Sequence, residues 1–269
     1  MTTAPSSPVA PRPAASVLLV RPGVACPVEV YMIRREKSMR FLGGFYAFPG
    51  GKVEPTDGSA DALARCRGIS SAAALAAFPA ADGIPPLAFW VTAARELVEE
   101  TGLLVGCDAD GRPVDLRDPA VGDRVERLRH ALVGEEAPFH VLLGREGWYL
   151  DLAPFRYLSH FITPPSSAIR FTARFFLAPV PAGQEPRLLG GEASEGFWID
   201  PAAGHRRFLA GEMPMAEPAD CGLGYIAGFD TLDDVWAAHT DGRHKFHGIL
   251  DRIETAGFSI PRSKRVGQT

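Results

Sequence analysis

One helix constrains this chain more than any other segment, because its two sides differ in chemistry. Pro85 and Pro86 precede it, the apolar spacing predicts a helix over Leu87–Thr101, and Gly102 stands where a left-handed cap closes a helix. At about 100° per residue, one side faces a core and the other presents acids. The core side carries Trp90, Ala93, Ala94, Leu97, Val98 and Thr101, and the acid side carries Glu96, Glu99 and Glu100.

The three glutamates stand at i, i+3 and i+4, so their carboxylates repel one another. One interpretation is a solvated face in which Arg95 and Glu99 pair across one turn. The other is a site for a hard divalent cation, since carboxylate oxygens suit Mg²⁺ or Mn²⁺ and a bound cation removes the repulsion. Such a cation lowers the pKa of a bound water and clamps phosphate oxygens.

Short strands and helices are expected elsewhere along the chain. Apolar, β-branched and aromatic runs predict the strands, and a helical spacing predicts the helices. The expected strands are Ser16–Val20, Val28–Ile33 (ended by Arg34 and Arg35), Tyr149–Thr163, Arg170–Pro179 and Glu195–Ile199, and the expected helices are His205–Gly211 and Thr231–His239. We find no internal repeat and no long linker, which predicts a single domain.

Two segments before the helix are rich in glycine, alanine or proline. Residues 41–51, FLGGFYAFPGG, place four glycines and a proline among aromatics, so the backbone there can approach a neighbour closely. Residues 58–86 are rich in Ala, Ser, Gly and Pro, with one helix expected around Ser70–Phe78. We interpret this second segment as an insertion that loops out.

The residues from Arg95 to Leu103 read R-E-L-V-E-E-T-G-L. They match the second half of the Nudix box, R-E-U-x-E-E-x-G-U with U aliphatic, at every fixed position, and residues 48–51, F-P-G-G, look like its usual opening. The chain therefore resembles a Nudix hydrolase over most of its length. The resemblance implies an α/β fold, a Nudix-type α/β/α sandwich with a mixed sheet, an insertion in the box and extra C-terminal helices.

The resemblance also implies roles for the box residues. Glu99 becomes a catalytic residue, and Arg95 and Gly102 become structural residues, with Arg95 pairing with box carboxylates. The cofactor is Mg²⁺ or Mn²⁺, which orients an attacking water and offsets the charge that develops on a diphosphate. The metal ligands would be the Gly50 carbonyl and the carboxylates of Glu96, Glu99 and Glu100.

The box departs from the family pattern in one large respect. Forty-three residues separate Gly51 from Arg95, thirty more than the family's thirteen. The early acid of the box falls at Asp57 by counting, with Glu54 as a competing candidate. An interrupted box of this kind is similar to the acyl-CoA diphosphatase-like subgroup, and a long surface insertion adds little loop entropy.

A second motif points to the substrate. CoA-cleaving members carry L-L-T-x-R-[S/A]-x3-R-x3-G-x3-F-P-G-G before the box, and this chain matches its arginines and first glycine with Arg35, Arg40 and Gly44. It departs where L-L-T is expected and at Glu36. Arginines bind phosphates through charge-assisted hydrogen bonds. The substrate-binding candidates are Arg35, Arg40, Gly44 and Gly51; the alternative is that the arginines merely end a strand and face solvent.

A late acid completes the candidate site. Glu195, three residues before Trp198, stands where many Nudix proteins bring an acid into the site, as a general base or a further ligand. Glu192 competes with it for this role.

Together these features predict a metal-dependent pyrophosphohydrolase of the Nudix family. The favoured reaction is that of a CoA diphosphatase, which converts CoA or acyl-CoA to adenosine 3′,5′-bisphosphate and (acyl-)4′-phosphopantetheine. The alternatives are hydrolysis of ADP-ribose, an NDP-sugar or another nucleoside diphosphate derivative, and an inactive Nudix domain that binds a nucleotide as a sensor. The preserved glutamates argue against the sensor.

Composition limits the partners and the setting. A net charge of −4 argues against nucleic acid or an anionic membrane as a main partner, and no apolar run is long enough to cross a bilayer. We expect a small-molecule nucleotide diphosphate as substrate, a cytoplasmic location from four widely spaced cysteines, and keep a homodimer open. The expected boundaries are a flexible Pro-rich N-terminus over 1–14, one domain over 15–258 with its insertion at 58–86 and a helical C-terminal extension at 204–258, and a basic tail over 259–269.

Overall fold

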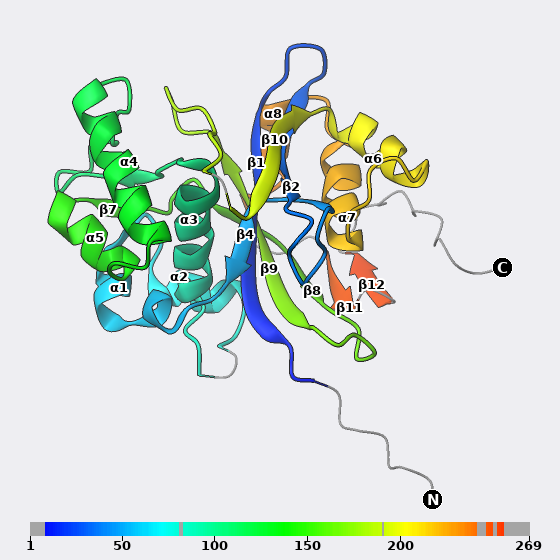
Figure 1. The fold of residues 1–269 in the computed structure, drawn as a ribbon, viewed down its shortest axis with the longest axis horizontal. Helices are drawn as coiled ribbons and strands as arrows, with labels where there is room; N and C mark the ends of the chain where they lie inside the picture. Colours follow the sequence, from blue (N-terminus) through cyan, green and yellow to red (C-terminus); the bar gives the residue numbers. More distant parts are fainter. Residues whose placement is uncertain (1–8, 81–82, 190, 241–245, 250–251, 256–269) are drawn as a thin grey trace, which may run out of the picture.

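The computed structural model describes residues 9–80, 83–189, 191–240, 246–249 and 252–255. The expected basic tail, with its run from Arg262 to Arg265, lies outside the described residues, and so do the first eight residues of the expected flexible N-terminus. Figure 1 shows the fold as a central sheet with helices on both sides.

A large mixed sheet organises the fold. Its strands in the described part are β1 Arg12–Pro22, β2 Val28–Arg35, β3 Tyr46–Ala47, β4 Gly50–Lys52, β8 Arg156–Ile162, β9 Phe171–Pro179, β10 Ala193–Ile199, β11 Phe246–Ile249 and β12 Arg252–Thr255. The strand order is β10-β2-β1-β9-β8-β11-β12, with β3 paired to β2 and β4 paired to β1. Strand β1 runs parallel to β9 and antiparallel to β2 and β4.

The helices and a small second sheet complete the described elements. The helices are η1 Pro55–Gly58, α1 Ala60–Ala64, α2 Ser71–Ala77, α3 Leu87–Thr101, α4 Pro119–Val133, α5 Phe139–Glu146, α6 Pro201–Leu209, α7 Glu217–Ile226 and α8 Leu232–Ala237. The small sheet has the order β5-β7-β6, formed by Cys66–Arg67, Tyr149–Asp151 and Gly106–Cys107.

Alternation along the strands divides the core into two layers. On β1, Val17 and Leu19 pack into the cluster that contains α3, whereas Leu18 and Val20 pack into the cluster that contains α7. Successive side chains of a strand point to opposite faces, so one apolar strand supplies both layers. The arrangement confirms the predicted α/β/α sandwich with a mixed sheet (Figure 1).

Helix α3 confirms the sequence-predicted helix residue for residue. It spans Leu87–Thr101, and Gly102 closes it with φ 72° and ψ 6°, while its N–H donates to the Val98 carbonyl. All of its residues except Glu99 are buried. The acid side is therefore enclosed by protein, which contradicts the interpretation of a solvated face.

The insertion packs against α3 through Phe78, at the end of α2. The Phe78 ring stacks on Trp90 of α3 with ring centroids 5.4 Å apart and an interplanar angle of 7°. The Arg174 guanidinium lies 4.5 Å from the Phe78 centroid, and Tyr157 lies 4.7 Å away. The helix expected around Ser70–Phe78 is confirmed as α2, but the insertion does not simply loop out, because its aromatic anchor belongs to the core.

Two predicted boundaries in the N-terminal half are wrong. Strand β1 begins at Arg12, so residues 12–14 belong to the sheet and not to a flexible terminus. Pro13 has no N–H to donate, but its carbonyl accepts from Val53 N at 3.0 Å. Strand β2 continues past the expected Ile33 and ends at Arg35, so both arginines belong to the strand.

The expected strand over 149–163 is two strands in different sheets. Strand β7 ends at Asp151 and β8 starts at Arg156, since Pro154 interrupts the run. Helices α4 and α5, which lie between the box and β7, were not predicted from the sequence.

The C-terminal extension is helical only in part. Helix α6 starts at Pro201, before the expected residue 204, and β11 and β12 follow within a region that was expected to be helical as far as residue 258. Helix α7 was also missed, because Pro218, Gly222 and Gly224 lower its intrinsic helix propensity. A bilayer-spanning helix, both long and apolar, is absent from the described part of the chain.

Candidate functional site

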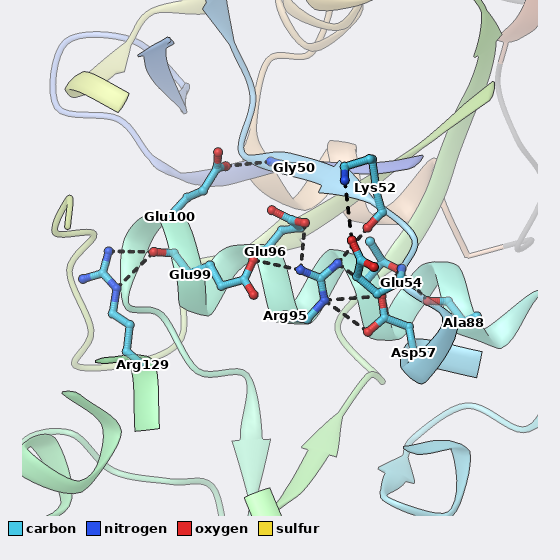
Figure 2. Close-up of polar contacts among 11 residues, drawn as sticks. Gly50, Lys52, Glu54, Asp57, Ala88, Arg95, Glu96, Glu99, Glu100 and Arg129 are labelled. Atoms are coloured by element: carbon cyan, nitrogen blue, oxygen red, sulfur yellow. Dashed lines mark hydrogen bonds and ion pairs between the residues drawn. The ribbon is translucent and has the colours of Figure 1, made fainter. Parts of the chain in front are cut away.

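Arg95 connects the parts of the candidate site. Its Nη1 pairs with Glu96 Oε1 at 2.9 Å and with Glu99 Oε2 at 2.8 Å, and its Nε lies 3.1 Å from Asp57 Oδ1. Its Nη2 donates to the Lys52 carbonyl at 2.7 Å. One buried guanidinium thus ties α3 to η1 and to the end of β4 (Figure 2). This contact set matches the structural pairing expected of Arg95.

The structure brings Asp57, and not Glu54, to the arginine. Asp57 is 2% exposed and accepts hydrogen bonds from Arg95, from Thr92 Oγ1 at 2.8 Å and from Glu54 N at 3.0 Å. Glu54 is exposed, and its side chain pairs with Lys52 at 3.7 Å and takes part in the capping box that starts η1. Of the two candidates for the early acid, Asp57 is therefore the one that contacts Arg95.

Glycines allow strand β4 to approach the acids. The N–H of Gly50 donates to Glu100 Oε2 at 2.7 Å. A Cβ on Gly51 would collide with the Glu96 carboxylate, so a larger residue here would displace this acid from its position beside the strand. The segment FPGG thus reaches the helix although 43 residues separate Gly51 from Arg95.

Burial makes the three carboxylates reluctant to ionise. Desolvation raises the pKa of Glu96 to about 8, although Arg95 opposes the shift. Desolvation raises the pKa of Glu100 well above its usual range, and the charge of Glu96 adds to this. The pKa of Glu99 is also raised by burial, against the effect of Arg95. For Arg95, burial lowers the pKa, but Glu96, Asp57 and Glu99 more than offset this and hold it charged.

The donor set suits a divalent cation. Glu100 Oε1 is buried and has no hydrogen-bond partner, an arrangement that a cation would relieve. Within the described ranges, no three Asp, Glu, His or Cys side chains converge closely enough to hold a metal ion as they stand. Figure 2 shows why: Glu96 and Glu99 turn toward Arg95, whereas Glu100 turns toward Gly50.

The two candidate phosphate-binding arginines differ in position. Arg35 is half-buried, and its charge is close enough to lower the pKa of Glu100 against the effect of burial. Its Nε donates to the Phe41 carbonyl at 3.3 Å. Arg40 is exposed on the loop after β2. Gly44 closes that loop with φ 80° and donates its N–H to the Arg35 carbonyl at 3.1 Å.

Of the two late acids, Glu192 lies nearer the box. Its charge raises the pKa of Glu96, Glu99 and Glu100, and its carbonyl accepts from Glu36 N at 2.8 Å. Glu195 lies within β10 on the same side as Phe197 and Ile199, which belong to the α7 layer. Its side chain therefore points to the face of the sheet opposite α3.

Sequence reasoning missed two residues that hold the end of α3. Arg129 of α4 donates to the Glu99 carbonyl, and the Gln184 amide pairs with both backbone groups of Leu104 at 2.9 Å. Asp118 followed by Pro119 is a helix-start signal that could have revealed α4. No sequence signal distinguishes Arg129 from the other arginines of that helix.

The role of Asp57 can be tested by stability. Asp57→Asn is expected to lower the free energy of unfolding by about 3 kcal/mol, because it leaves part of the buried Arg95 charge uncompensated. Glu54→Gln, at an exposed acid three residues away, is expected to change it by less than about 1 kcal/mol. Urea denaturation of the purified variants measures both values. Equal losses, or a larger loss for the Glu54 variant, would contradict the assignment.

The carboxylates also predict a pH dependence in a chelator such as EDTA. Because the folded pKa of Glu96 is about 8 and its unfolded value is 4.5, the folded state holds a proton that the unfolded chain releases. Its contribution is fully present below the unfolded pKa and is lost as pH rises through the folded pKa, by up to about 1.4 kcal/mol per pH unit. Unfolding free energies from pH 5 to about 8 should fall for the wild type and for Glu54→Gln. The free energy should fall less with pH for Glu96→Gln, because this variant has no carboxyl group to titrate at position 96. If the variant showed the same decrease with pH as the wild type, Glu96 would not be the group responsible.

Comparisons with known proteins agree with this geometry. No family model matches the chain. Acyl-coenzyme A diphosphatase NUDT19 from Gallus gallus is 27% identical over an alignment of 275 positions, which covers 86% of this chain and 71% of that protein. The crystal structure of a Nudix hydrolase from Alicyclobacillus acidocaldarius is 31% identical, with a TM-score of 0.71, and the match covers 85% of this chain and 96% of that one. A relative this similar, matched over nearly its whole length, shows that the chain belongs to the Nudix hydrolase family and is a hydrolytic enzyme.

Proposed function

We propose that this enzyme hydrolyses the diphosphate of CoA or acyl-CoA with the help of Mg²⁺ or Mn²⁺. The products would be adenosine 3′,5′-bisphosphate and 4′-phosphopantetheine or its acyl form. The observation that carries the metal-dependent part is the buried, unpartnered Oε1 of Glu100 beside Glu96 and Glu99. Carboxylate oxygens are the ligands that hard divalent cations prefer.

The metal ligands in this proposal are the carboxylates of Glu96, Glu99 and Glu100 with the Gly50 carbonyl. Nudix hydrolases generally use divalent metal ions. When bound, such a cation neutralises diphosphate oxygens and lowers the pKa of a coordinated water. The raised pKa values of the acids fit this role, because a cation favours their ionised forms.

The chain's own residues would bind and orient the substrate. Arg35, whose charge reaches Glu100, and Arg40, on the exposed loop, would hold phosphate oxygens through charge-assisted hydrogen bonds. Gly44 would shape that loop, and Gly51 would leave room beside Glu96. Glu192 would accept a proton from the attacking water as the P–O anhydride bond breaks, and it replaces Glu195 as the candidate base.

Two observations favour CoA over other diphosphates. The spacing of Arg35, Arg40 and Gly44 before FPGG resembles that of CoA-cleaving Nudix proteins. NUDT19, 27% identical to this chain, is named an acyl-coenzyme A diphosphatase. ADP-ribose or NDP-sugar hydrolysis stays the alternative, since those substrates also need arginines.

The proposal extends to the setting of the enzyme. Its partner is a small nucleotide diphosphate, with no nucleic acid and no membrane, and its location is cytoplasmic. The large sheet and its two helical layers act as one domain that contains the insertion at 58–86.

A substrate panel tests the reaction and its metal. With Mg²⁺ or Mn²⁺, we expect hydrolysis of CoA or acyl-CoA with a higher kcat/KM than ADP-ribose, NADH or NDP-sugars, measured by product chromatography. Glu99→Gln should lower kcat by about 100-fold or more, because an amide cannot supply the same anionic ligand. Glu54→Gln serves as the exposed control. A preference for ADP-ribose would end the CoA proposal, and full activity of Glu99→Gln would end the metal assignment.

The late acid is tested by a matched pair. Glu192→Gln should lower kcat by about 100-fold or more with little change in KM, as expected for loss of a general base. Glu195→Gln should leave both constants near those of the wild type, since that side chain lies on the other face of the sheet. The reverse pattern would restore Glu195 to the role.

A further inference from the structure

The carbonyl end of α3 is held from several directions. Its last residue, Thr101, accepts from Arg187 N at 2.8 Å, and the Val98 carbonyl accepts from Gly102 N at 3.0 Å. Between them stands the Glu99 carbonyl, whose partner is a side chain from α4. The last turn of a helix leaves carbonyls without intrahelical partners, so each of these contacts fixes one of them.

Arg129 supplies that partner. Its Nε and Nη2 donate to the Glu99 carbonyl at 3.1 and 3.0 Å, as Figure 2 shows. The residue is 1% exposed, among the most deeply buried large side chains described. Burial lowers the pKa of Arg129, while the charge of Glu126 opposes the shift. An arginine remains charged under these conditions, so the fold places a buried cation behind the acid helix.

Glu99 is thereby fixed at both ends. Its carboxylate pairs with Arg95 at 2.8 Å, and its carbonyl is held by the fork of Arg129. It is also the one residue of α3 that is not buried, so its position depends less on packing than that of the other helix residues. Gly102 already caps the helix in the left-handed conformation. Burying the Arg129 guanidinium is costly, and capping alone does not explain that cost.

We propose that Arg129 is a positioning residue for the hydrolytic reaction. Its two hydrogen bonds to the Glu99 carbonyl fix the conformation of the last turn of α3, so that Glu99 and Glu100 present their carboxylates to the metal. This inference rests on the proposed metal role of those acids. Replacing a residue that contacts a metal ligand, and not the metal itself, typically changes metal affinity or activity by about 10- to 100-fold.

The experiment measures Mn²⁺ binding by electron paramagnetic resonance on the full chain, together with kcat, KM and the melting temperature. Arg129→Met, which removes the charge and the fork, should raise the Kd for Mn²⁺ and lower kcat, each by about tenfold, with KM for CoA unchanged. Arg129→Lys keeps the charge and should fall between this variant and the wild type. Arg124→Lys is the matched control on the same helix, since Arg124 pairs with Glu146 at 2.6 Å and not with α3, and its Mn²⁺ affinity should equal that of the wild type.

The outcomes separate the inference from the function it rests on. A wild type that binds Mn²⁺, a Glu99→Gln variant that binds it weakly and an Arg129→Met variant that binds it like the wild type would leave the metal site standing and overturn the role of Arg129. A wild type that binds no Mn²⁺ would overturn both. If Arg129→Met does not fold, Arg129→Lys decides: wild-type Mn²⁺ affinity and kcat with only a lower melting temperature would make Arg129 a structural cap and overturn the proposal.

Discussion

The site depends on the hydrogen bonds and ion pairs of one buried guanidinium. Arg95 contacts Asp57, Glu96 and Glu99 and the Lys52 carbonyl, so three elements converge on it. An unpaired buried charge is strongly unfavourable, and a fully paired one fixes its partners in place. The same pairing gathers acids that would otherwise repel one another. The geometry of the acid helix is therefore inseparable from that of the loop before it.

The long interruption of the box is tolerated because both of its ends are held in space. Gly50 bonds to Glu100 and Asp57 bonds to Arg95, so the residues before the insertion meet those after it. The insertion itself contributes to the core: Phe78 stacks on Trp90, and Arg174 lies against the Phe78 ring. The extra residues thus add to the core around Trp90, while Glu100 keeps its contact with Gly50 of β4.

The arrangement of charges in the site lowers the stability of the fold, and a metal-binding function would explain why it is kept. Three glutamates with raised pKa values, two of them buried and one of these with an unpartnered oxygen, are less stable without a cation than a neutral set would be. Arg95, which pairs with Glu96 and Glu99, offsets part of this charge. Such an arrangement is typical of a site that gives up stability for chemistry.

The sequence alone determined the local features. The spacing of Leu87–Thr101 and Gly102 predicted α3 to the residue, and the pattern around Arg95 was enough to identify the family. Only the tertiary structure brought Asp57, and not Glu54, into contact with Arg95, and turned Glu195 to the face of the sheet opposite α3. The physical reason is the range of the interactions. Helix periodicity and motif spacing depend on residues a few positions apart, whereas burial and charge contacts join residues that are far apart in the sequence. Arg129, thirty positions after Glu99, shows this difference, since nothing in its own segment marks it as a partner of α3.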